Sequence, residues 1–288
     1  NNVVKFSDNL SHYFRQGIYA DKDGIDKNKS VSAIVQGGKV TNTYAKNIKI
    51  TSKEEAFNGV FVDNGTYTLN GAVINFVGNG GNDFAGYGAA VMAKGKNATL
   101  VVNNTKISTK GAVRTAAAAS DGGHLIVKNS ELQTKDGTLP SDYKFTIALG
   151  EMMEVPWMLS LSGNCRATNL LGKDSKETYI NSSVSAENWG VLSSDNCTNG
   201  KITSINSKIA ITGKSGYGTA VIGGVISSFY GSEISVPDYG AVIMGGDVVY
   251  ADSNQTVVED LNKNLALGLT SKEIKSLKNQ NTKVKAGR

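Results

Sequence analysis

The stretches that decide the fold read Val102-Asn103-Asn104-Thr105-Lys106-Ile107 and Val127-Lys128-Asn129-Ser130-Glu131-Leu132. In both, an alternating apolar run meets Asn with a small or polar residue, and another apolar residue follows. Related copies stand at Ala45-Lys46-Asn47-Ile48, Thr68-Leu69-Asn70-Gly71-Ala72-Val73, Tyr179-Ile180-Asn181-Ser182-Ser183-Val184, Ile205-Asn206-Ser207-Lys208-Ile209 and, without the Asn, Tyr230-Gly231-Ser232-Glu233-Ile234. Such self-similarity predicts a repeat fold.

The spacing of the Asn residues gives the length of the repeat. Asn70, Asn104, Asn129, Asn181 and Asn206 are separated by 34, 25, 52 and 25 residues. We interpret the 52-residue step as two repeats, with Leu159-Ser160-Leu161-Ser162-Gly163-Asn164 as the missing copy. A unit of about 25 residues is too short for a helix pair, and it lacks the Leu-rich consensus of a horseshoe. Consecutive parallel strands joined by crossovers wind right-handed. The sequence therefore predicts an all-β, right-handed parallel β-helix, a solenoid whose Asn residues form a ladder.

A second element precedes each Asn element. It is an aromatic residue or Arg, usually followed by Gly and a small or apolar strand. Its members are Tyr87, Arg114, Trp157, Trp189, Tyr217 and Tyr239. They predict strands near 87–94, 112–119, 157–162, 189–194, 217–223 and 239–245, stacked in one sheet. The resulting column either packs the solenoid or binds flat ligands, with Arg114 holding a carboxylate.

With these repeats, residues 30–250 resemble the right-handed parallel β-helix proteins of the pectin-lyase-like class, particularly secreted bacterial β-helix repeat proteins. The resemblance implies the fold and a secreted or cell-surface location, but no reaction. The chain departs from two enzyme families of this class. It lacks the Asp-rich calcium cluster of pectate lyases and the paired Asp motifs with Gly-His-Gly of polygalacturonases, so their catalytic residues cannot be transferred.

The two ends do not share the repeat. Residues 1–29 predict an N-terminal capping segment, because a solenoid end exposes both core and strand edges. Residues 251–288 predict a short helical cap or the start of a further segment. Val257, Val258, Leu261 and Leu265 have helical spacing there, and Thr270-Ser271-Lys272-Glu273 is a capping-box pattern. Between the ends, residues 137–156 break the period as an irregular loop, a place where function concentrates.

The two cysteines lie in similar turns. Ser162-Gly163-Asn164-Cys165 matches Ser194-Asp195-Asn196-Cys197, so neighbouring repeats would bring the thiols within disulfide range. Ser120-Asp121-Gly122-Gly123-His124 resembles the same turn one repeat earlier. A disulfide, two unbonded thiols, and a Cys/His constellation for catalysis or metal binding all remain open.

The irregular loop and the strand entrances together predict a ligand site. Arg114, Trp157, Trp189, Tyr87 and Tyr217 are the candidate substrate-binding residues. Asp195, Glu154 and Arg166 are the candidate catalytic residues, because carboxylates transfer protons and a cation stabilises a developing enolate. Asp83, Glu151 and Glu187 lie near the same strands, although most such acids are solvated turn residues.

Two functions fit these residues. The first is a secreted lyase or hydrolase acting on a carbohydrate or another small anionic or aromatic substrate. The second is a non-catalytic surface, adhesion or glycan-binding module, since function lies in sites and not in folds.

The charge and the hydropathy of the sequence limit the classes of binding partner. The net charge is +5, from 30 basic and 25 acidic residues that are scattered along the sequence until the last thirty positions. This pattern predicts no nucleic-acid partner, and the absence of a long apolar run predicts no membrane span. We expect no cofactor and no metal. A homo-oligomer and a further segment of the same protein are the other partners considered.

Overall fold

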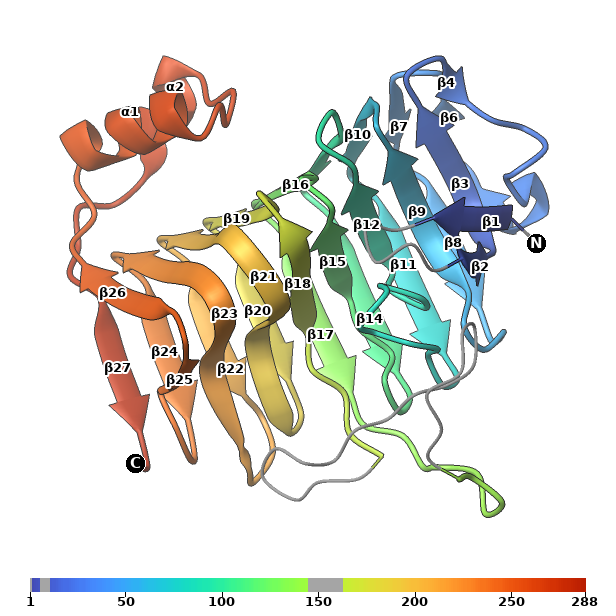
Figure 1. Cartoon of the computed structure of the whole chain (residues 1–288). Helices are drawn as coiled ribbons and strands as arrows, with labels where there is room; N and C mark the ends of the chain where they lie inside the picture. Colours follow the sequence, from blue (N-terminus) through green and yellow to red (C-terminus); the bar gives the residue numbers. More distant parts are fainter. Residues whose placement is uncertain (1, 6–10, 145–162) are drawn as a thin grey trace.

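The computed structural model describes residues 2–5, 11–144 and 163–288, with side chains described from residue 15 onward. Nearly all of its regular structure is β, and most strands pair in parallel with a strand one repeat away in the sequence (Figure 1). We call each run of the chain that adds one strand to every stack a layer. Three stacks of strands result.

The first two stacks belong to one curled sheet, because β21 (Trp189–Ile205) and β23 (Gly216–Tyr230) pass through both. The first stack also contains β3 (Gln16–Asp21), β9 (Asn58–Asp63), β12 (Val91–Lys94), β15 (Ala117–Ser120), β18 (Thr168–Lys173) and β25 (Ala241–Met244). The second also contains β7 (Tyr44–Lys46), β10 (Thr66–Asn70), β13 (Thr99–Asn103), β16 (His124–Lys128), β19 (Lys176–Ile180) and β26 (Asp247–Ala251).

The third stack is a separate nine-stranded sheet in the described part of the chain. Its parallel strands are β8 (Lys49–Ser52), β11 (Val73–Val77), β14 (Lys106–Lys110), β17 (Glu131–Lys135), β20 (Ser183–Ala186), β22 (Lys208–Ile211), β24 (Glu233–Val236) and β27 (Lys283–Ala286). Side chains alternate strictly between the two faces. The inward column of Ile50, Ile74, Ile107, Leu132, Val184, Ile209 and Ile234 is buried and forms one wall of the core.

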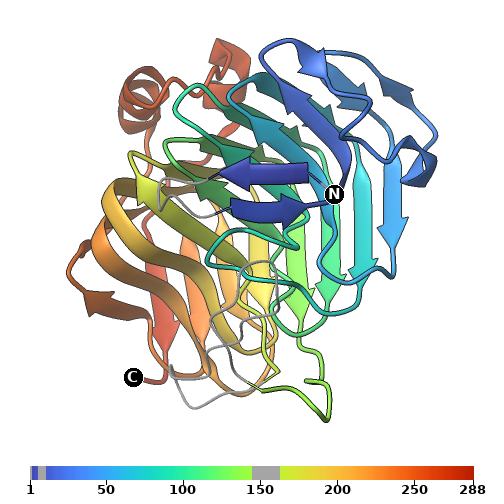
Figure 2. The ribbon, with the colours of Figure 1, turned by 45° about the vertical axis from the view of Figure 1, so that its right-hand side comes forward.

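The beginning of the stacks is closed by antiparallel strands. β4 (Gly24–Ile25) pairs with β3, β5 (Val35–Gln36) with β8, and β6 (Lys39–Val40) with β7, with the 3-10 turn η1 (Ser32–Ile34) beside them. A hairpin of β1 (Asn2–Lys5) and β2 (Ser11–Phe14) stands in front of the first stack in Figure 2. The free strand edges at this end are therefore partly paired.

The other end is open. Its last layer carries exposed apolar side chains on β25, β26 and β27, namely Ile243, Met244, Val249, Tyr250 and Val284. The helices α1 (Gln255–Asn264) and α2 (Ser271–Ser276) lie between β26 and β27. They do not close this end, because Val258, Leu265, Leu267 and Ile274 pack on Ile126, Ile180 and Ile205 on the outer side of the second stack. The predicted helical spacing and the capping box at Thr270 and Glu273 are confirmed.

The strand prediction is confirmed for five of its six segments, which contain or overlap β12, β15, β21, β23 and β25. The sixth, 157–162, lies outside the described residues, and β18 provides the strand of that layer. The 52-residue step was misinterpreted as two repeats. It is one layer with an excursion between β17 and β18, because β16 pairs directly with β19.

The corner between the second and third stacks explains the Asn pattern. Asn104, Asn129, Asn181 and Asn206 have φ between 47° and 51° there, a left-handed conformation that Asn tolerates. The next residue of each layer is Ser or Thr, and its hydroxyl accepts the backbone N–H of its counterpart one layer earlier. This holds for Thr105, Ser130, Ser182, Ser207, Ser232 and Thr282.

The predicted Asn ladder is present from Asn70 to Asn181 with two shifts, but Asn206 does not belong to it, because its Nδ2 donates to the Lys278 carbonyl. Gly71 and not Asn70 takes the left-handed position in its layer, and Asn103 replaces Asn104 in the chain of amides. Asn129 Nδ2 donates to Asn103 Oδ1 at 3.1 Å, and Asn181 Nδ2 donates to Asn129 Oδ1 at 2.8 Å. The ladder thus joins layers through side chains as well as through backbone bonds.

Replacing Asn129 with Leu is expected to lower the free energy of unfolding by about 1–3 kcal/mol, because two amide bonds are lost and Leu disfavours the left-handed backbone. Urea denaturation measures this loss. Asn129→Gly is the matched control, since it removes the amide but keeps the backbone conformation accessible. Equal stability of Asn129→Leu and the wild type would contradict a role for this corner.

Candidate functional site

Three of the predicted site residues meet around one guanidinium group. Arg166 Nε donates to Asp83 Oδ2 at 2.7 Å, and Arg166 Nη2 donates to Asp195 Oδ2 at 2.5 Å. The same guanidinium lies over the rings of Phe84 and Trp189, 5.2 and 4.9 Å from their centroids. We call these residues, with Asn169, the Arg166 cluster.

Different parts of the chain supply the cluster. Arg166 stands two residues before β18, Asn169 lies on β18, and Asp195 lies on β21, the neighbouring strand of the first stack. Asp83 and Phe84 belong to an excursion between β11 and β12 that reaches across from two layers away. Asn169 Nδ2 donates to the Asp83 carbonyl at 3.0 Å and to Asp195 Oδ2 at 3.1 Å. The cluster therefore fastens the excursion to the first stack.

Burial decides what the cluster can do. Asp83, Asp195, Arg166 and Trp189 are between 1% and 5% exposed, and Asn169 is fully buried. Burial opposes the charge of Arg166, but Asp195 and Asp83 outweigh it and raise its pKa. Burial also raises the pKa of Asp195, which Arg166 partly offsets. Asp83 Oδ1, Asn169 Oδ1 and Trp189 Nε1 have no hydrogen-bond partner among the described residues.

Arg114 points into the core, away from this cluster. Its Nη1 donates to the carbonyls of Glu54, Gly78 and Asn79, and its Nη2 donates to the carbonyl of Phe57 at 2.7 Å. The guanidinium lies 4.6 Å from the Phe76 ring centroid, and the residue is fully buried. Burial lowers the pKa of Arg114 to about 10. This side chain holds backbone turns together and presents no surface to a ligand in solution.

The other predicted substrate-binding residues do not form one exposed ribbon. Tyr217 is fully buried, and its hydroxyl lies 2.5 Å from Ser193 Oγ. Tyr87 is half-buried against Tyr19, Phe61 and Met92. Trp189 pairs with Gly216 in the sheet, one position before Tyr217, so these rings are offset along the chain. Glu154, Glu151 and Trp157 lie outside the described residues.

The two cysteines are free, so no disulfide joins them. The matching turns do not stack, because Cys197 pairs with Gly172 on one side and Gly223 on the other. Burial raises the pKa of Cys197 to about 12 and that of Cys165 well above the usual value, which keeps both as thiols. His124 contacts Thr178 and neither cysteine. No His/Cys/Asp/Glu group that could hold a metal is found among the residues with assigned positions.

A surface that sequence reasoning missed lies on the outer side of the nine-stranded sheet. The strands of the third stack place exposed lysines there, together with two glutamates. These charged residues are Lys49, Lys106, Lys110, Lys135, Lys208, Lys283, Lys285, Glu131 and Glu233. We call this surface the lysine face. None of its lysines forms an ion pair within the described residues.

The lysine face carries the whole net charge of the chain. Seven lysines against two glutamates give +5, which leaves 23 basic and 23 acidic residues elsewhere. Between the charged positions runs a column of uncharged side chains, most of them hydroxyls and amides: Thr51, Asn75, Ser108, Gln133, Ser185, Ala210 and Ser235. Neighbouring strands lie about 4.8 Å apart, so the column is a regular polar array.

The lysines appear scattered in the sequence because successive layers supply them. The sequence signal for three of these lysines is their position directly after the Ser or Thr that follows the corner Asn. Lys106, Lys208 and Lys283 each follow a Thr or Ser at this place and precede an aliphatic residue, which is buried after Lys106 and Lys208 and exposed after Lys283. Lysines that are scattered along the sequence thus gather on one face of the folded chain.

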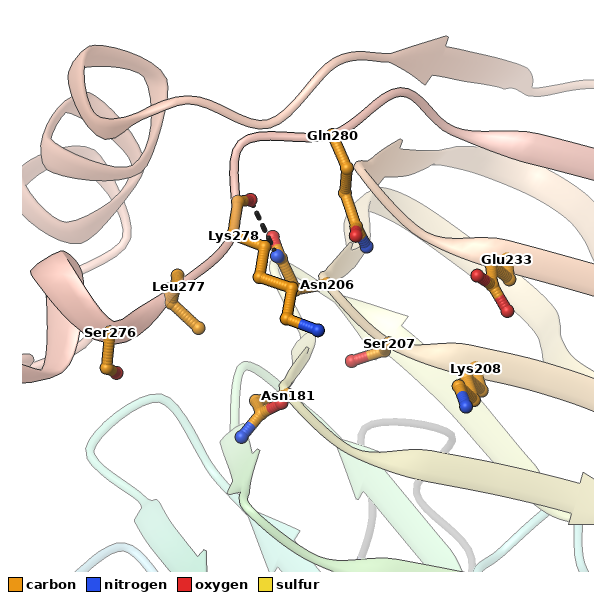
Figure 3. A pocket seen from close by; sticks show the side chains of 9 residues that line it. All are labelled: Asn181, Asn206, Ser207, Lys208, Glu233, Ser276, Leu277, Lys278 and Gln280. Atoms are coloured by element: carbon orange, nitrogen blue, oxygen red, sulfur yellow. Dashed lines mark hydrogen bonds between the residues drawn. The ribbon is translucent and has the colours of Figure 1, made fainter.

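Grooves run along both edges of the lysine face. Along the Asn corner, one groove passes Asn104, Lys106 and Glu131. A second, of about 330 Å³, continues between this corner and the segment after α2 (Figure 3). It is lined by Asn181, Asn206, Ser207, Lys208, Glu233, Ser276, Leu277, Lys278 and Gln280. The opposite edge has a groove lined in part by Lys110, Lys135 and Asp136.

No protein-family model, curated protein or solved structure matches this chain. The resemblance to pectin-lyase-like proteins thus stays a prediction. None of the helices in the described ranges is long and apolar enough to cross a membrane.

Proposed function

We propose that this chain is a right-handed parallel β-helix module that binds an extended anionic polysaccharide along its lysine face, outside the cell or at its surface. The observation that carries the proposal is the concentration of the net charge on one exposed sheet face, which also carries the exposed side chains of Val73 and Val77. The parallel pairing of strands in successive layers supports the solenoid, and the rule for crossover connections supports its hand.

An extended polymer suits this surface better than a compact ligand. In the column that starts at Lys49, the other lysines are Lys106, Lys208 and Lys283, two, three and two layers apart in turn. With about 4.8 Å between strands, the cations recur every 10 to 15 Å or so along the stack. The hydroxyl and amide column beside them can exchange hydrogen bonds with sugar hydroxyls.

A polysaccharide is favoured over a nucleic acid by the chemistry of the side chains. Proteins that bind single strands combine a basic groove with aromatic rings on which bases stack. The strands of the lysine face carry no exposed aromatic residue in the described chain, and their cations are lysines, not the arginines that grip phosphate in bidentate fashion.

A binding module is also favoured over the lyase or hydrolase. Arg166 and Asp195 are paired with each other and buried, and Arg114 is buried with Nη1 and Nη2 bonded to backbone carbonyls. A general acid or base must come within hydrogen-bond reach of a substrate proton, directly or through one water. The buried cluster has the features of a structural anchor.

The variant Lys106→Gln, Lys110→Gln, Lys135→Gln is expected to bind polygalacturonate about tenfold more weakly than the wild type. Each exposed charge contact contributes up to about 0.5–1 kcal/mol, and 1.4 kcal/mol is a factor of ten. Affinity should also fall as salt is added, because screening weakens surface contacts. Affinity electrophoresis and calorimetry measure both effects.

The matched control is Lys173→Gln, Lys201→Gln, Lys272→Gln, which removes the same charge from exposed positions outside the face. It should bind like the wild type. Equal weakening in both variants would mean that only net charge matters. If duplex DNA bound more tightly than polygalacturonate, the ligand would be a nucleic acid and not a polysaccharide. If the protein cleaved the polymer, the enzyme hypothesis would be the correct one.

A further inference from the structure

The amide ladder is interrupted where the groove in Figure 3 begins. Up to Asn181, each Asn of the ladder donates its Nδ2 hydrogen to the amide oxygen of the previous layer. Asn206 instead donates to the Lys278 carbonyl at 2.8 Å, as the dashed line shows. No described residue donates to Asn181 Oδ1, and Asn206 Oδ1 is buried without a partner. The Asn206 acceptor is therefore buried and lacks a donor, whereas Asn181 is exposed and water can reach its amide oxygen.

The surroundings of these acceptors define what would satisfy them. Lys208 and Lys278 bring two ammonium groups to the groove, and Glu233 brings one carboxylate, so its net charge is +1. Ser276 lies at the end of α2, and Gln280 lies beyond Lys278 on the opposite wall (Figure 3). A ligand that fits must offer hydroxyl donors to the amides and an anion to the lysines.

We infer that this groove is a subsite for one carboxylated sugar unit, which fixes the position of the polymer on the lysine face. Its volume of about 330 Å³ lies at the lower end of the range for small-ligand sites, so a single sugar ring suits it better than a chain. The sugar carboxylate would lie between Lys208 and Lys278, and its hydroxyls would donate to Asn181, Asn206 and Glu233.

Because Lys208 and Glu233 belong to both surfaces, this subsite rests on the proposed function of the lysine face. The two can still fail separately. A short oligosaccharide can occupy the groove without crossing the sheet, whereas a long polymer contacts Lys106, Lys110 and Lys135 as well. Trigalacturonate and polygalacturonate are therefore the two probes, and a neutral galactose trisaccharide tests the need for the carboxylate.

The first variants are Lys278→Gln, which removes a charge that belongs to the groove alone, and Asn206→Gly, which removes the amide while the left-handed backbone at φ 48° stays accessible. Each variant should weaken trigalacturonate binding by about threefold to fivefold, because each removes one contact. Lys272→Gln on α2, six residues before Lys278, and Asn104→Gly at the same corner are the matched controls, and they should keep wild-type affinity. Thermal melting of each variant checks that it is folded.

Calorimetry with both probes separates the outcomes. The inference is supported if the groove variants lose the trisaccharide and the Lys106→Gln, Lys110→Gln, Lys135→Gln variant keeps it while losing the polymer. It is overturned if folded Lys278→Gln and Asn206→Gly bind trigalacturonate normally, if the neutral trisaccharide binds equally well, or if the wild type binds only the polymer. In the last case the lysine face still stands. If the Lys106→Gln, Lys110→Gln, Lys135→Gln variant bound the polymer as tightly as the wild type, the proposed function would be overturned instead.

Discussion

Replacing Arg166 with Met is expected to lower the free energy of unfolding by about 3–5 kcal/mol. The substitution keeps much of the side-chain volume, but it leaves Asp83 and Asp195 buried without the cation that both of them contact. Removing one partner from a buried ion network is costly, because the remaining charges have lost their hydration and gained nothing in return. Urea denaturation with fluorescence of Trp189 and Trp157 measures the change.

The control for Arg166 neutralises the partners together with it. The triple variant Arg166→Met, Asp83→Asn, Asp195→Asn should recover part of the lost stability, since no uncompensated charge remains. Failure to recover would mean that packing on Phe84 and Trp189 matters more than charge. If Arg166→Met alone unfolds like the wild type, the carboxylates are not isolated from water, and an accessible site around Asp195 becomes the better explanation.

Replacing Arg114 with Leu is expected to cost about 3 kcal/mol or more. The backbone carbonyls of Glu54, Phe57, Gly78 and Asn79 would lose their shared donor; the Phe57 bond is buried, the other three are partly buried, and the Asn79 carbonyl keeps the N–H of Ala56. Each buried acceptor left without a partner costs about 1–3 kcal/mol, although the groups near the corner can partly relax toward water. Thermal unfolding gives the total loss, and hydrogen exchange at residues 54–57 and 78–80 shows whether these turns loosen first.

Arg15 provides the comparison for Arg114. The Arg15 guanidinium lies 5.5 Å from the centroid of the Phe57 ring and forms an ion pair with Glu54. Its side chain is nevertheless 44% exposed. Surface ion pairs contribute little, so Arg15→Leu should change stability by less than about 1 kcal/mol. Similar losses in both variants would show that Arg114 acts as an ordinary surface residue and not as a core donor.

The repeat could be predicted from sequence because local chemistry sets it. Asn takes the left-handed corner, a hydroxyl follows, and alternation then fixes which residues enter the core, as at Asn129, Ser130 and Leu132. The number of layers was harder to predict. Spacing alone cannot distinguish two short layers from one layer with a long excursion, and only the pairing of β16 with β19 decides between them.

The candidate site was predicted less well, and the reason lies in the backbone. Val113 and Trp189 have φ of 56° and 69°, which reverses the regular alternation at the strand entrances. Residues counted into one column, such as Arg114 and Trp189, therefore point to opposite sides of the sheet wall, one toward Phe76 and the other toward Arg166. The sequence predicted that Arg166 and Asp195 belong to one site because they lie on adjacent layers. It did not predict the contact of Asp83 with them, because Asp83 belongs to an excursion whose course cannot be inferred from a local sequence pattern.

The layered arrangement also has a mechanical consequence. The two termini lie at opposite ends of the stack in Figure 1, so tension between them acts along the direction in which strands bond to strands. The backbone hydrogen bonds that hold one layer to the next would then break one after another. A regular layer of 25 residues, such as that from Asn181 to Asn206, would release about 85 Å of extended chain. A stack of this kind would yield to a pull in steps, each absorbing work, while the layers not yet reached keep their part of the lysine face intact.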